Sequence, residues 1–484
     1  MTIIGTDWHD NIFLGGWVPG SGERITVTSP GSGEELGVVG CATADDVRRA
    51  ARQAAVAQRD WAAKTPSARA AVLRRAGLLW EQHAEEVQSW LVKEAGSIPP
   101  KAGLETQIAA DECYEAAALP THPAGEVLAT NQPRWSLARR RPAGVVTVIA
   151  PFNFPLILSI RSVAPALALG NAVLLKPDPR TTIGGGVALV QIFREAGLPD
   201  GLLQLIPGGR ETGEAAIVAD EVRVVSFTGS TAAGRAVGAL GAQHLKRTHL
   251  ELGGNNALIV LPGADLTKAV SAGAFGSFMH QGQICMTAGR QLVHESLHDD
   301  YIEALAATAD HLPVGDPAAG QVALGPVIDE AQLLKIDKLV QDSVRQGAEL
   351  AAGGTFEGLF YRPTVLARVT GNMPAWREEI FGPVAPVRSF SSVEEVIALA
   401  SDSEYGLSVG ILGDVGEAMK LADAIPSGIV HINEQTVDDE ANAPFGGVAA
   451  SGTGSRFGGA RANIEAFTET QWLTVRSDIA PYPF

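Results

Sequence analysis

Short, continuous hydrophobic runs alternate with helical stretches along most of the chain. The runs lie at residues 145–149, 172–175, 203–206, 222–227 and 257–260, and similar runs recur near 291–294, 384–390, 408–412 and 428–432. The segments between the first runs are long enough for crossover helices, which join parallel strands. The pattern therefore predicts an α/β fold with parallel sheets, in two lobes that meet near residue 255.

The two ends of the chain depart from this alternation. Thr43 and Asp46 are typical of a capped helix start, and the apolar pattern that follows predicts helices over about 44–62 and 66–94. Residues 464–478 end in alternating polar and apolar positions, which predicts a strand that leaves the body of the fold.

Nineteen consecutive residues without a charge, 142–160, have the length of a membrane-spanning candidate, for which about 18 residues suffice. Pro151, Asn153 and Pro155 lie in the middle of this run. Prolines disfavour a continuous helix there, and a side-chain amide in a bilayer would need a partner. We therefore expect a buried strand over 145–149, an irregular turn that holds Asn153, and then a helix, rather than a membrane span.

Composition and charge narrow the class of protein. The chain has 484 residues, 46% of them hydrophobic and 19% charged, which is typical of a large α/β protein of two or three domains. A net charge of −17 argues against a nucleic-acid partner or an anionic membrane surface. The N-terminal residues lack the pattern of a signal peptide, and the three cysteines lack metal-type spacing. We expect a protein of the reducing cytoplasm, without a metal site.

Two motifs follow expected strands, at the position where open α/β sheets bind ligands. FTGSTAAG (227–234) is a glycine turn that opens a helix and offers N–H groups to an anion, although a simple helix cap is equally plausible. The second motif is LKPDPRT (175–181), in which Lys176 directly follows the expected strand 172–175. A lysine in this place can bind a ribose hydroxyl or a phosphate. For this lysine alone, a solvated strand end is the commoner alternative.

Two further residues indicate acid–base or covalent chemistry. Glu251, in LELGG, has few charged neighbours in sequence, so its pKa can rise toward that of a general base. Cys285, in GQICMTAGR, is a candidate nucleophile if a base or a cation generates its thiolate. Taken singly, a hydrogen-bonded structural glutamate is equally plausible, and a buried cysteine is more often a small apolar residue.

Six motifs in order, PFNFP, LKP, FTGSTAAG, LELGG, GQIC and EEIFGP, resemble those of the aldehyde dehydrogenase superfamily, over residues 10–478 approximately. The resemblance implies a Rossmann-like cofactor domain (1–120 and 143–252), a catalytic α/β domain (253–450) and a small β oligomerisation extension (121–142 and 463–484). It also implies assembly as a homodimer or homotetramer, which fits an exposed edge strand that needs a partner.

The resemblance also implies the chemistry. Cys285 would attack an aldehyde, and the oxyanion formed would be held by the Asn153 side-chain amide and the Cys285 backbone N–H. Hydride would pass to the nicotinamide, and water activated by Glu251 would hydrolyse the thioester. Matched to the family in this way, the cofactor-binding residues are Ile149, Ala150, Pro151, Lys176, Gly213, Phe227, Gly229, Ser230, Gly234, Leu252, Glu379 and Phe381.

The coenzyme depends on the residues after Lys176. NAD-preferring members of the family often carry a glutamate three residues after this lysine, where it repels a 2′-phosphate. Here Pro179 stands in that place, with Asp178 before it and Arg180 after it. We expect NAD as the coenzyme, with NADP as a possible alternative.

The C-terminal segments HINEQTVDDEANAPFGG and TQWLTVRSD resemble the benzaldehyde and vanillin dehydrogenase branch, which implies an aromatic aldehyde substrate. Phe154 and Phe445 match positions that line the substrate tunnel. Arg161 is either an ion-paired residue or a contact for an anionic or phenolic substituent. The alternatives are a semialdehyde or aliphatic aldehyde dehydrogenase, a CoA-acylating enzyme, a cysteine hydrolase that uses His280, and a non-catalytic structural or binding protein that keeps the fold.

Overall fold

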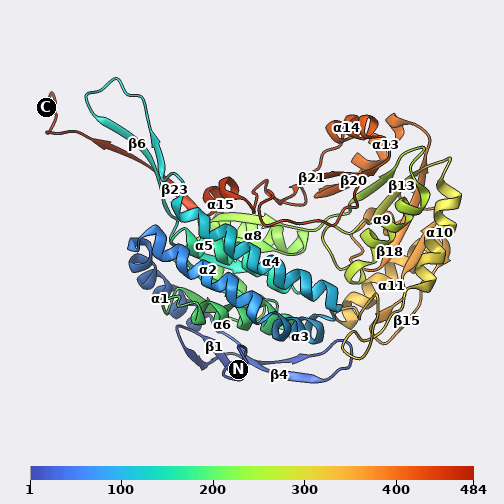
Figure 1. Ribbon diagram of the computed structural model, residues 1–484, viewed down its shortest axis with the longest axis horizontal. Coiled ribbons are helices and arrows are strands. Elements are labelled where there is room, and N and C mark those ends of the chain that lie inside the picture. The colour runs from blue at the N-terminus through green and yellow to red at the C-terminus, as the bar shows by residue number, and fades with distance from the viewer. Residues whose placement is uncertain (1) are drawn as a thin grey trace.

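The computed structural model describes residues 2–484 and builds them around two seven-stranded sheets (Figure 1). The first sheet has the order β11-β10-β7-β8-β9-β1-β2, with bounds Arg247–Glu251, Val222–Thr228, Val145–Ile149, Ala172–Lys176, Leu203–Leu205, Asn11–Phe13 and Trp17–Pro19. The strands from β11 to β9 run parallel, and β1 joins β9 antiparallel. Every residue of β7 and β8 is buried, as expected of parallel strands covered on both faces.

The second sheet has the order β14-β17-β18-β13-β12-β20-β21. Its strands span Glu349–Ala352, Thr364–Ala367, Val384–Phe390, Arg290–His294, Ala257–Val260, Ser408–Leu412 and Ile429–Ile432. All neighbours pair parallel except β14 with β17. The described residues also form three two-stranded sheets: Arg24–Thr28 with Glu35–Gly40 (β3, β4), Phe356–Glu357 with Phe360–Tyr361 (β15, β16), and Tyr405–Gly406 with Val448–Ala449 (β19, β22).

Helices cover both large sheets and separate into two groups (Figure 1). Those of the N-terminal half are α1 Ala44–Ala63, α2 Pro66–Gln82, α3 Ala84–Ala95, α4 Pro99–Ala118, α5 Pro155–Ala168, α6 Ala188–Glu195, α7 Arg210–Val218 and α8 Thr231–Gln243. Those of the C-terminal half are α9 Leu266–Phe278, α10 His298–His311, α11 Glu330–Arg345, α12 Pro374–Arg377, α13 Val393–Ser401 and α14 Val415–Ala424, whereas α15 Ala460–Phe467 returns to the first group and packs against α4 and α5. The structure thus confirms the predicted α/β fold.

The uncharged run 142–160 folds as strand, turn and helix, as predicted. It supplies β7, a turn around Asn153, and the start of the buried helix α5 at Pro155. No helix within residues 2–484 has both the length and the apolarity needed to cross a membrane.

One prediction about an individual helix is wrong. The single helix expected over 66–94 is two helices, because His83 leaves the helical conformation (φ −107°, ψ 15°) and both ends α2 and begins α3. Two acidic residues in the first turn of α3 favour this new N-terminus, which carries a positive partial charge. The run 257–260 is β12 and lies in the second sheet, which agrees with a boundary between the lobes near residue 255. The strand β11 at the edge of the first sheet was not predicted.

The predicted C-terminal strand is present and pairs with a segment from the first third of the chain. β23 (Thr468–Val475) runs antiparallel to β6 (Trp135–Pro142), which also pairs with β5 (Gly125–Val127). Figure 1 shows that this three-stranded sheet projects from the body of the molecule. β23 lies at its edge, with Trp135 and Trp472 both about two-thirds exposed (66% and 65%).

Candidate active site

The segments that carry Asn153, Glu251 and Cys285 meet between the two large sheets. Asn153 lies in the turn after β7, and its side-chain Nδ2 donates to the carbonyl of Gln283, two residues before Cys285, at 2.9 Å. Glu251 is the last residue of β11. The chain then passes Gly254, where a Cβ would lie 2.6 Å from the Cys285 carbonyl oxygen. Residues more than 130 positions apart in the sequence therefore form one site.

The Cys285 thiol lies in a largely apolar setting. It packs among Ile284, Met286, Leu407 and Phe445. Burial, with a smaller contribution from the Glu379 carboxylate, raises the pKa of Cys285 to about 12, although the Arg161 guanidinium opposes the rise. The thiol is therefore protonated at neutral pH, so a nucleophilic role requires a nearby base.

Glu251 has the features of such a base. One oxygen, Oε2, accepts a hydrogen bond from the Gly447 backbone N–H at 3.2 Å, while the buried Oε1 has no partner among the described residues. Burial raises the pKa of Glu251 to about 8, although the Gly447 N–H and the Arg161 guanidinium both oppose the rise. The carboxyl group can therefore exchange a proton near neutral pH.

A fully buried ion pair on α4 holds the Asn153 turn in place. Lys101 Nζ donates to the Asn153 backbone carbonyl at 2.6 Å and pairs with Glu105. Glu105 Oε2 accepts from the backbone N–H of Leu156 at 3.1 Å, in the first turn of α5. Lys101 also lies 4.2 Å from the centre of the Phe154 ring. The sequence analysis missed this pair; its only signal is a lysine and a glutamate four residues apart on a helix face that is otherwise apolar.

The loop before Cys285 has an unusual backbone. His280, Gln281 and Gly282 all have positive φ angles (48°, 56° and 65°), a conformation that costs energy for the first two. A Cβ at Gly282 would lie 2.0 Å from the Gly382 carbonyl oxygen, so a glycine is required there. This contact brings the neighbour of Gly382, Phe381 (φ 55°), beside the loop of Cys285.

The residues matched to a cofactor role form two groups. A Cβ at Gly213 would contact Lys176 and Ile149 at 3.6 and 3.8 Å, and the Ala150 N–H donates to the Lys176 carbonyl at 3.1 Å. These residues, followed by Pro151, lie at the carboxyl ends of β7 and β8. Ligands bind at this edge in open α/β sheets.

The second group surrounds the start of α8. Cβ atoms at Gly229 and Gly234 would lie 2.6 Å from the Phe227 ring and 2.2 Å from Leu252. The Ser230 hydroxyl accepts from the Ala233 N–H at 3.3 Å, so it caps α8. The helix-cap alternative considered for this motif is therefore present.

Glu379 connects this edge to the catalytic loop. Its Oε1 accepts from the Gly254 N–H at 3.0 Å, and a Cβ at Gly253 would lie 2.3 Å from Oε2. Burial raises the pKa of Glu379 to about 6, opposed by that N–H. Phe381 meets Phe152 edge to face, with ring centres 5.9 Å apart.

The charges after Lys176 neutralise one another. Lys176 is buried and donates to the Pro177 carbonyl at 3.2 Å. Asp178 pairs with Arg180 at 2.8 Å, and Arg180 also pairs with Asp329. Asp178 is therefore already paired, and its repulsion of a 2′-phosphate is correspondingly weaker.

Phe154 and Phe445 lie beside Cys285, and Arg161 lies against Phe445. Both phenylalanines belong to the apolar cluster that contains the thiol. Arg161, on α5, is 2% exposed, forms an ion pair with Asp439, and lies 4.4 Å from the centre of the Phe445 ring. The ion-paired alternative for Arg161 is therefore present in the structure. The sequence analysis missed Asp439, because nothing in the segment VDDE distinguishes this acidic residue from its acidic neighbours.

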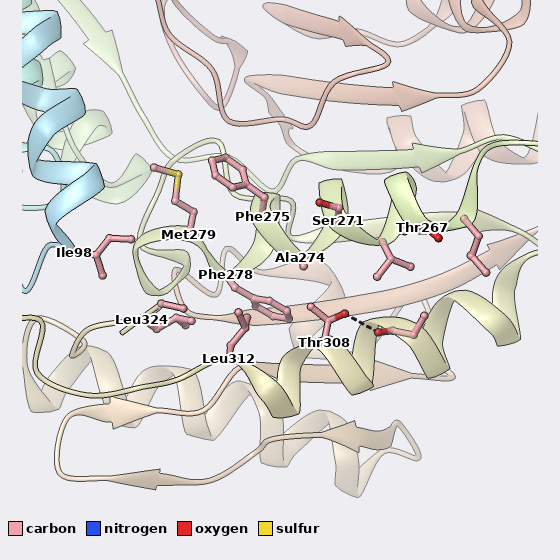
Figure 2. A pocket seen from close by; sticks show the side chains of 14 residues that line it. Ile98, Thr267, Ser271, Ala274, Phe275, Phe278, Met279, Thr308, Leu312 and Leu324 are labelled. Carbon is pink, nitrogen blue, oxygen red and sulfur yellow. Dashed lines mark hydrogen bonds between the residues drawn. The ribbon is translucent and has the colours of Figure 1, made fainter. Parts of the chain in front are cut away.

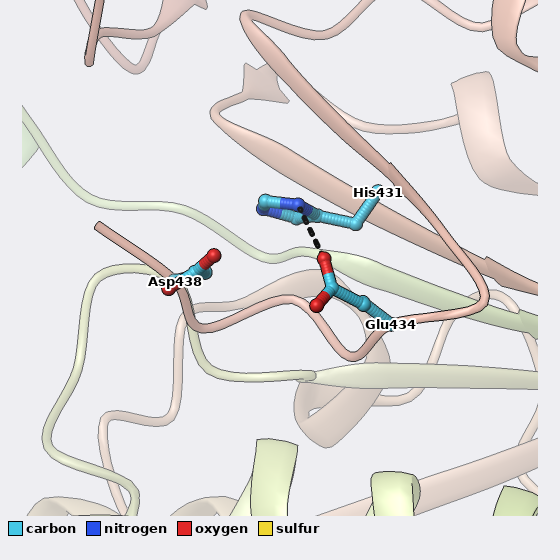
Figure 3. Close-up of side chains that lie close together, drawn as sticks. All are labelled: His431, Glu434 and Asp438. Atoms are coloured by element: carbon cyan, nitrogen blue, oxygen red, sulfur yellow. Dashed lines mark ion pairs between the residues drawn. The ribbon is translucent and has the colours of Figure 1, made fainter. Parts of the chain in front are cut away.

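Two further features of the structure are a cavity and a cluster of titratable side chains. A cavity of about 610 Å³ between α9 and α10, beside Ile98, is lined mainly by apolar side chains such as Phe278 and Leu312 and holds no titratable group (Figure 2). His431, Glu434 and Asp438 gather near the end of β21, where the His431 Nδ1 lies 3.8 Å from Glu434 (Figure 3). The two acids are exposed, as carboxylates commonly are without a metal.

Comparisons with known proteins agree with this arrangement. A vanillin dehydrogenase of Amycolatopsis sp. is 63% identical over 99% of this chain and 98% of that protein. A benzaldehyde dehydrogenase [NAD(+)] of Pseudomonas putida is 46% identical over 99% of this chain and 98% of that protein. The structure of a salicylaldehyde dehydrogenase from Pseudomonas putida G7, complexed with salicylaldehyde, superposes with a TM-score of 0.94 at 35% identity, covering 98% and 99% of the two chains. Since the model of the Aldehyde dehydrogenase family matches residues 17–473, the chain belongs to that family.

Proposed function

We propose that this protein oxidises an aromatic aldehyde of the benzaldehyde or vanillin type to its carboxylic acid, with NAD as coenzyme. The observation that carries the proposal is the position of the Cys285 thiol, within one apolar cluster with Phe154 and Phe445 and beside Asn153 and Glu251. Aryl rings pack well against such aromatic side chains. Relatives that cover nearly the whole chain are named for aromatic aldehydes.

Cys285 forms a bond to the aldehyde carbon after Glu251 has taken the thiol proton, either directly or through water. The thiohemiacetal oxygen then becomes negative. One hydrogen of the Asn153 amide is held by the Gln283 carbonyl, which leaves the second free to donate to that oxygen. After Glu251 has released the thiol proton to solvent, it removes a proton from the water that attacks the thioester, and this attack releases the acid and restores the thiol.

The residues at the edge of the first sheet fit a dinucleotide. The glycines at 213, 229 and 234 leave room for the side chains of Lys176, Phe227 and Leu252, which Cβ atoms would contact or overlap, so these side chains can pack closely at the edge where such folds bind ligands. Lys176 would hold the adenine ribose, and Glu379 would hold the nicotinamide ribose. When bound, NAD supplies the acceptor for the hydride that leaves the substrate carbon.

Steady-state kinetics with several aldehydes and both coenzymes test this proposal. We expect kcat/KM for benzaldehyde and vanillin to exceed that for hexanal and succinic semialdehyde, and NAD to exceed NADP. NADP is expected to retain some activity, because Asp178 is paired with Arg180. Equal or better efficiency with hexanal would refute the aromatic assignment. A product formed only with added CoA would instead identify an acylating enzyme.

We also propose that the sheet of β5, β6 and β23 is an oligomerisation surface and that the protein is a homodimer or homotetramer. The eight-residue edge strand β23, with Trp472 exposed, is a template for a further strand. Sedimentation velocity at micromolar concentration should give at least twice the mass of one chain, and a single-chain mass would refute the proposal.

We further propose a cytoplasmic location, in keeping with three free cysteine thiols, and cell fractionation tests it.

A further inference from the structure

A buried group of charged residues borders the apolar cluster that holds Cys285. Arg161 on α5 pairs with Asp439, and Glu112 on α4 lies close enough to both to interact electrostatically. Arg161 is 2% exposed and Glu112 is 1% exposed. The mechanism proposed above uses none of these side chains.

Each of the three residues has a polar atom that the protein leaves unpaired. Asp439 Oδ1, Arg161 Nε and Glu112 Oε1 are buried, and none has a hydrogen-bond partner among the described residues. A buried polar atom without a partner is costly. Three such atoms in one place therefore indicate a site that receives a hydrogen-bonding group from outside the chain.

This polar group lies next to the space expected for the aryl ring. The Arg161 guanidinium faces the Phe445 ring, with 4.4 Å between its central carbon and the ring centre. Val437, two residues before Asp439, belongs to the same apolar cluster as Phe445 and Cys285. Phe445 and Cys285 belong to one apolar cluster, so Arg161, which faces Phe445, borders the cluster that holds the thiol.

We propose that Asp439, held in place by Arg161, determines specificity by accepting a hydrogen bond from a hydroxyl group on the aromatic ring. The favoured substrates are then hydroxylated aromatic aldehydes. This inference rests on the proposed function, because it requires an aromatic aldehyde bound to Cys285.

The charges favour a neutral hydroxyl over an anionic substituent. The Arg161 Nη2 is already bound to Asp439, so it is not free to receive a carboxylate or a phenolate. An anionic group would also approach the Asp439 carboxylate itself. A neutral hydroxyl avoids this repulsion and donates a charge-assisted hydrogen bond, which is stronger than one between neutral groups.

The test compares aldehydes whose ring substituent either can or cannot donate a hydrogen bond. We would measure kcat/KM for 3- and 4-hydroxybenzaldehyde and for the corresponding fluorobenzaldehydes, at saturating NAD and a pH at which the phenols are neutral. Fluorine occupies nearly the space of a hydroxyl but donates no hydrogen bond. The ratio of the two values, taken within one enzyme variant, cancels any general loss of activity.

We expect the wild-type ratio to be about tenfold or more for at least one ring position. In Asp439→Asn the same ratio should fall to about threefold or less, since the acceptor has lost its charge. Glu440→Gln, at the exposed neighbouring residue, is the matched control and should keep the wild-type ratio.

Two outcomes would overturn the inference. A wild-type ratio near one at both ring positions would mean that Asp439 binds only water, and this result stands even if the Asp439→Asn variant fails to fold. An unchanged ratio in a folded Asp439→Asn variant would place hydroxyl recognition elsewhere. Failure of the proposed function is distinguishable, because the fluorobenzaldehydes would then not be oxidised by the wild-type enzyme either.

Discussion

Replacement of Cys285 by alanine should abolish aldehyde-dependent NADH formation, by about 10⁴-fold or more, because no other group can form the covalent intermediate. Cys41 and Cys113 are also free thiols, but both are buried away from this site, in or beside α1 and α4. NAD binding should remain measurable by fluorescence or calorimetry in the Cys285→Ala variant. Normal turnover by this variant would show that the nucleophile is wrongly assigned.

A second variant in the same assay separates the nucleophile from the oxyanion donor. Asn153→Ala keeps the thiol but removes the amide that lies against the Cys285 loop. Loss of one such donor typically costs ~3 kcal/mol of barrier, which is about a hundredfold in rate. We therefore expect slow but measurable NADH formation with Asn153→Ala. If the two variants were equally inactive, the amide would instead be needed to fold the loop, and circular dichroism would reveal that change.

Replacement of Glu251 by glutamine should leave the first turnover faster than the release of product. We expect a burst of NADH close to one per active site, followed by a steady rate lower by roughly 10²- to 10⁴-fold, because water attack on the thioester has lost its base. Rapid-mixing absorbance at 340 nm, the wavelength of NADH, measures both phases. A single slow phase without a burst would show that loss of Glu251 slows the deprotonation of Cys285 at least as much as it slows the attack of water on the thioester.

The pH dependence supplies an independent readout for Glu251. Its pKa is raised to about 8 by burial, so the carboxyl is largely protonated at pH 7 and becomes the active base as the pH rises. The wild-type deacylation rate should therefore increase through about pH 8 and then level off, and Glu251→Gln should lack this increase. Glu378→Gln, an exposed glutamate next to Glu379, is the matched control and should keep the wild-type profile.

The sequence alone was sufficient for much of the fold. Parallel strands that are buried on both faces must be continuously apolar, so runs such as 145–149 and 408–412 were recognisable without any tertiary information. Pro151, Asn153 and Pro155 likewise excluded a membrane helix, because proline restricts the backbone locally. The break at His83 was not recognisable, because the apolar pattern continues through it.

For the candidate site too, the sequence determined some properties and the tertiary structure decided the others. Cys285, Glu251 and Asn153 lie in short motifs whose order matches a known family, so the sequence determined which residue types are present and the chemistry they can perform. Only the tertiary structure decided that burial raises the pKa of Glu251 and that Lys101 holds the Asn153 turn. Only the tertiary structure placed the unpaired atoms of Arg161 and Asp439 beside Phe445. Desolvation and hydrogen bonding depend on neighbours that lie far away along the chain, and a local pattern of residues does not contain them.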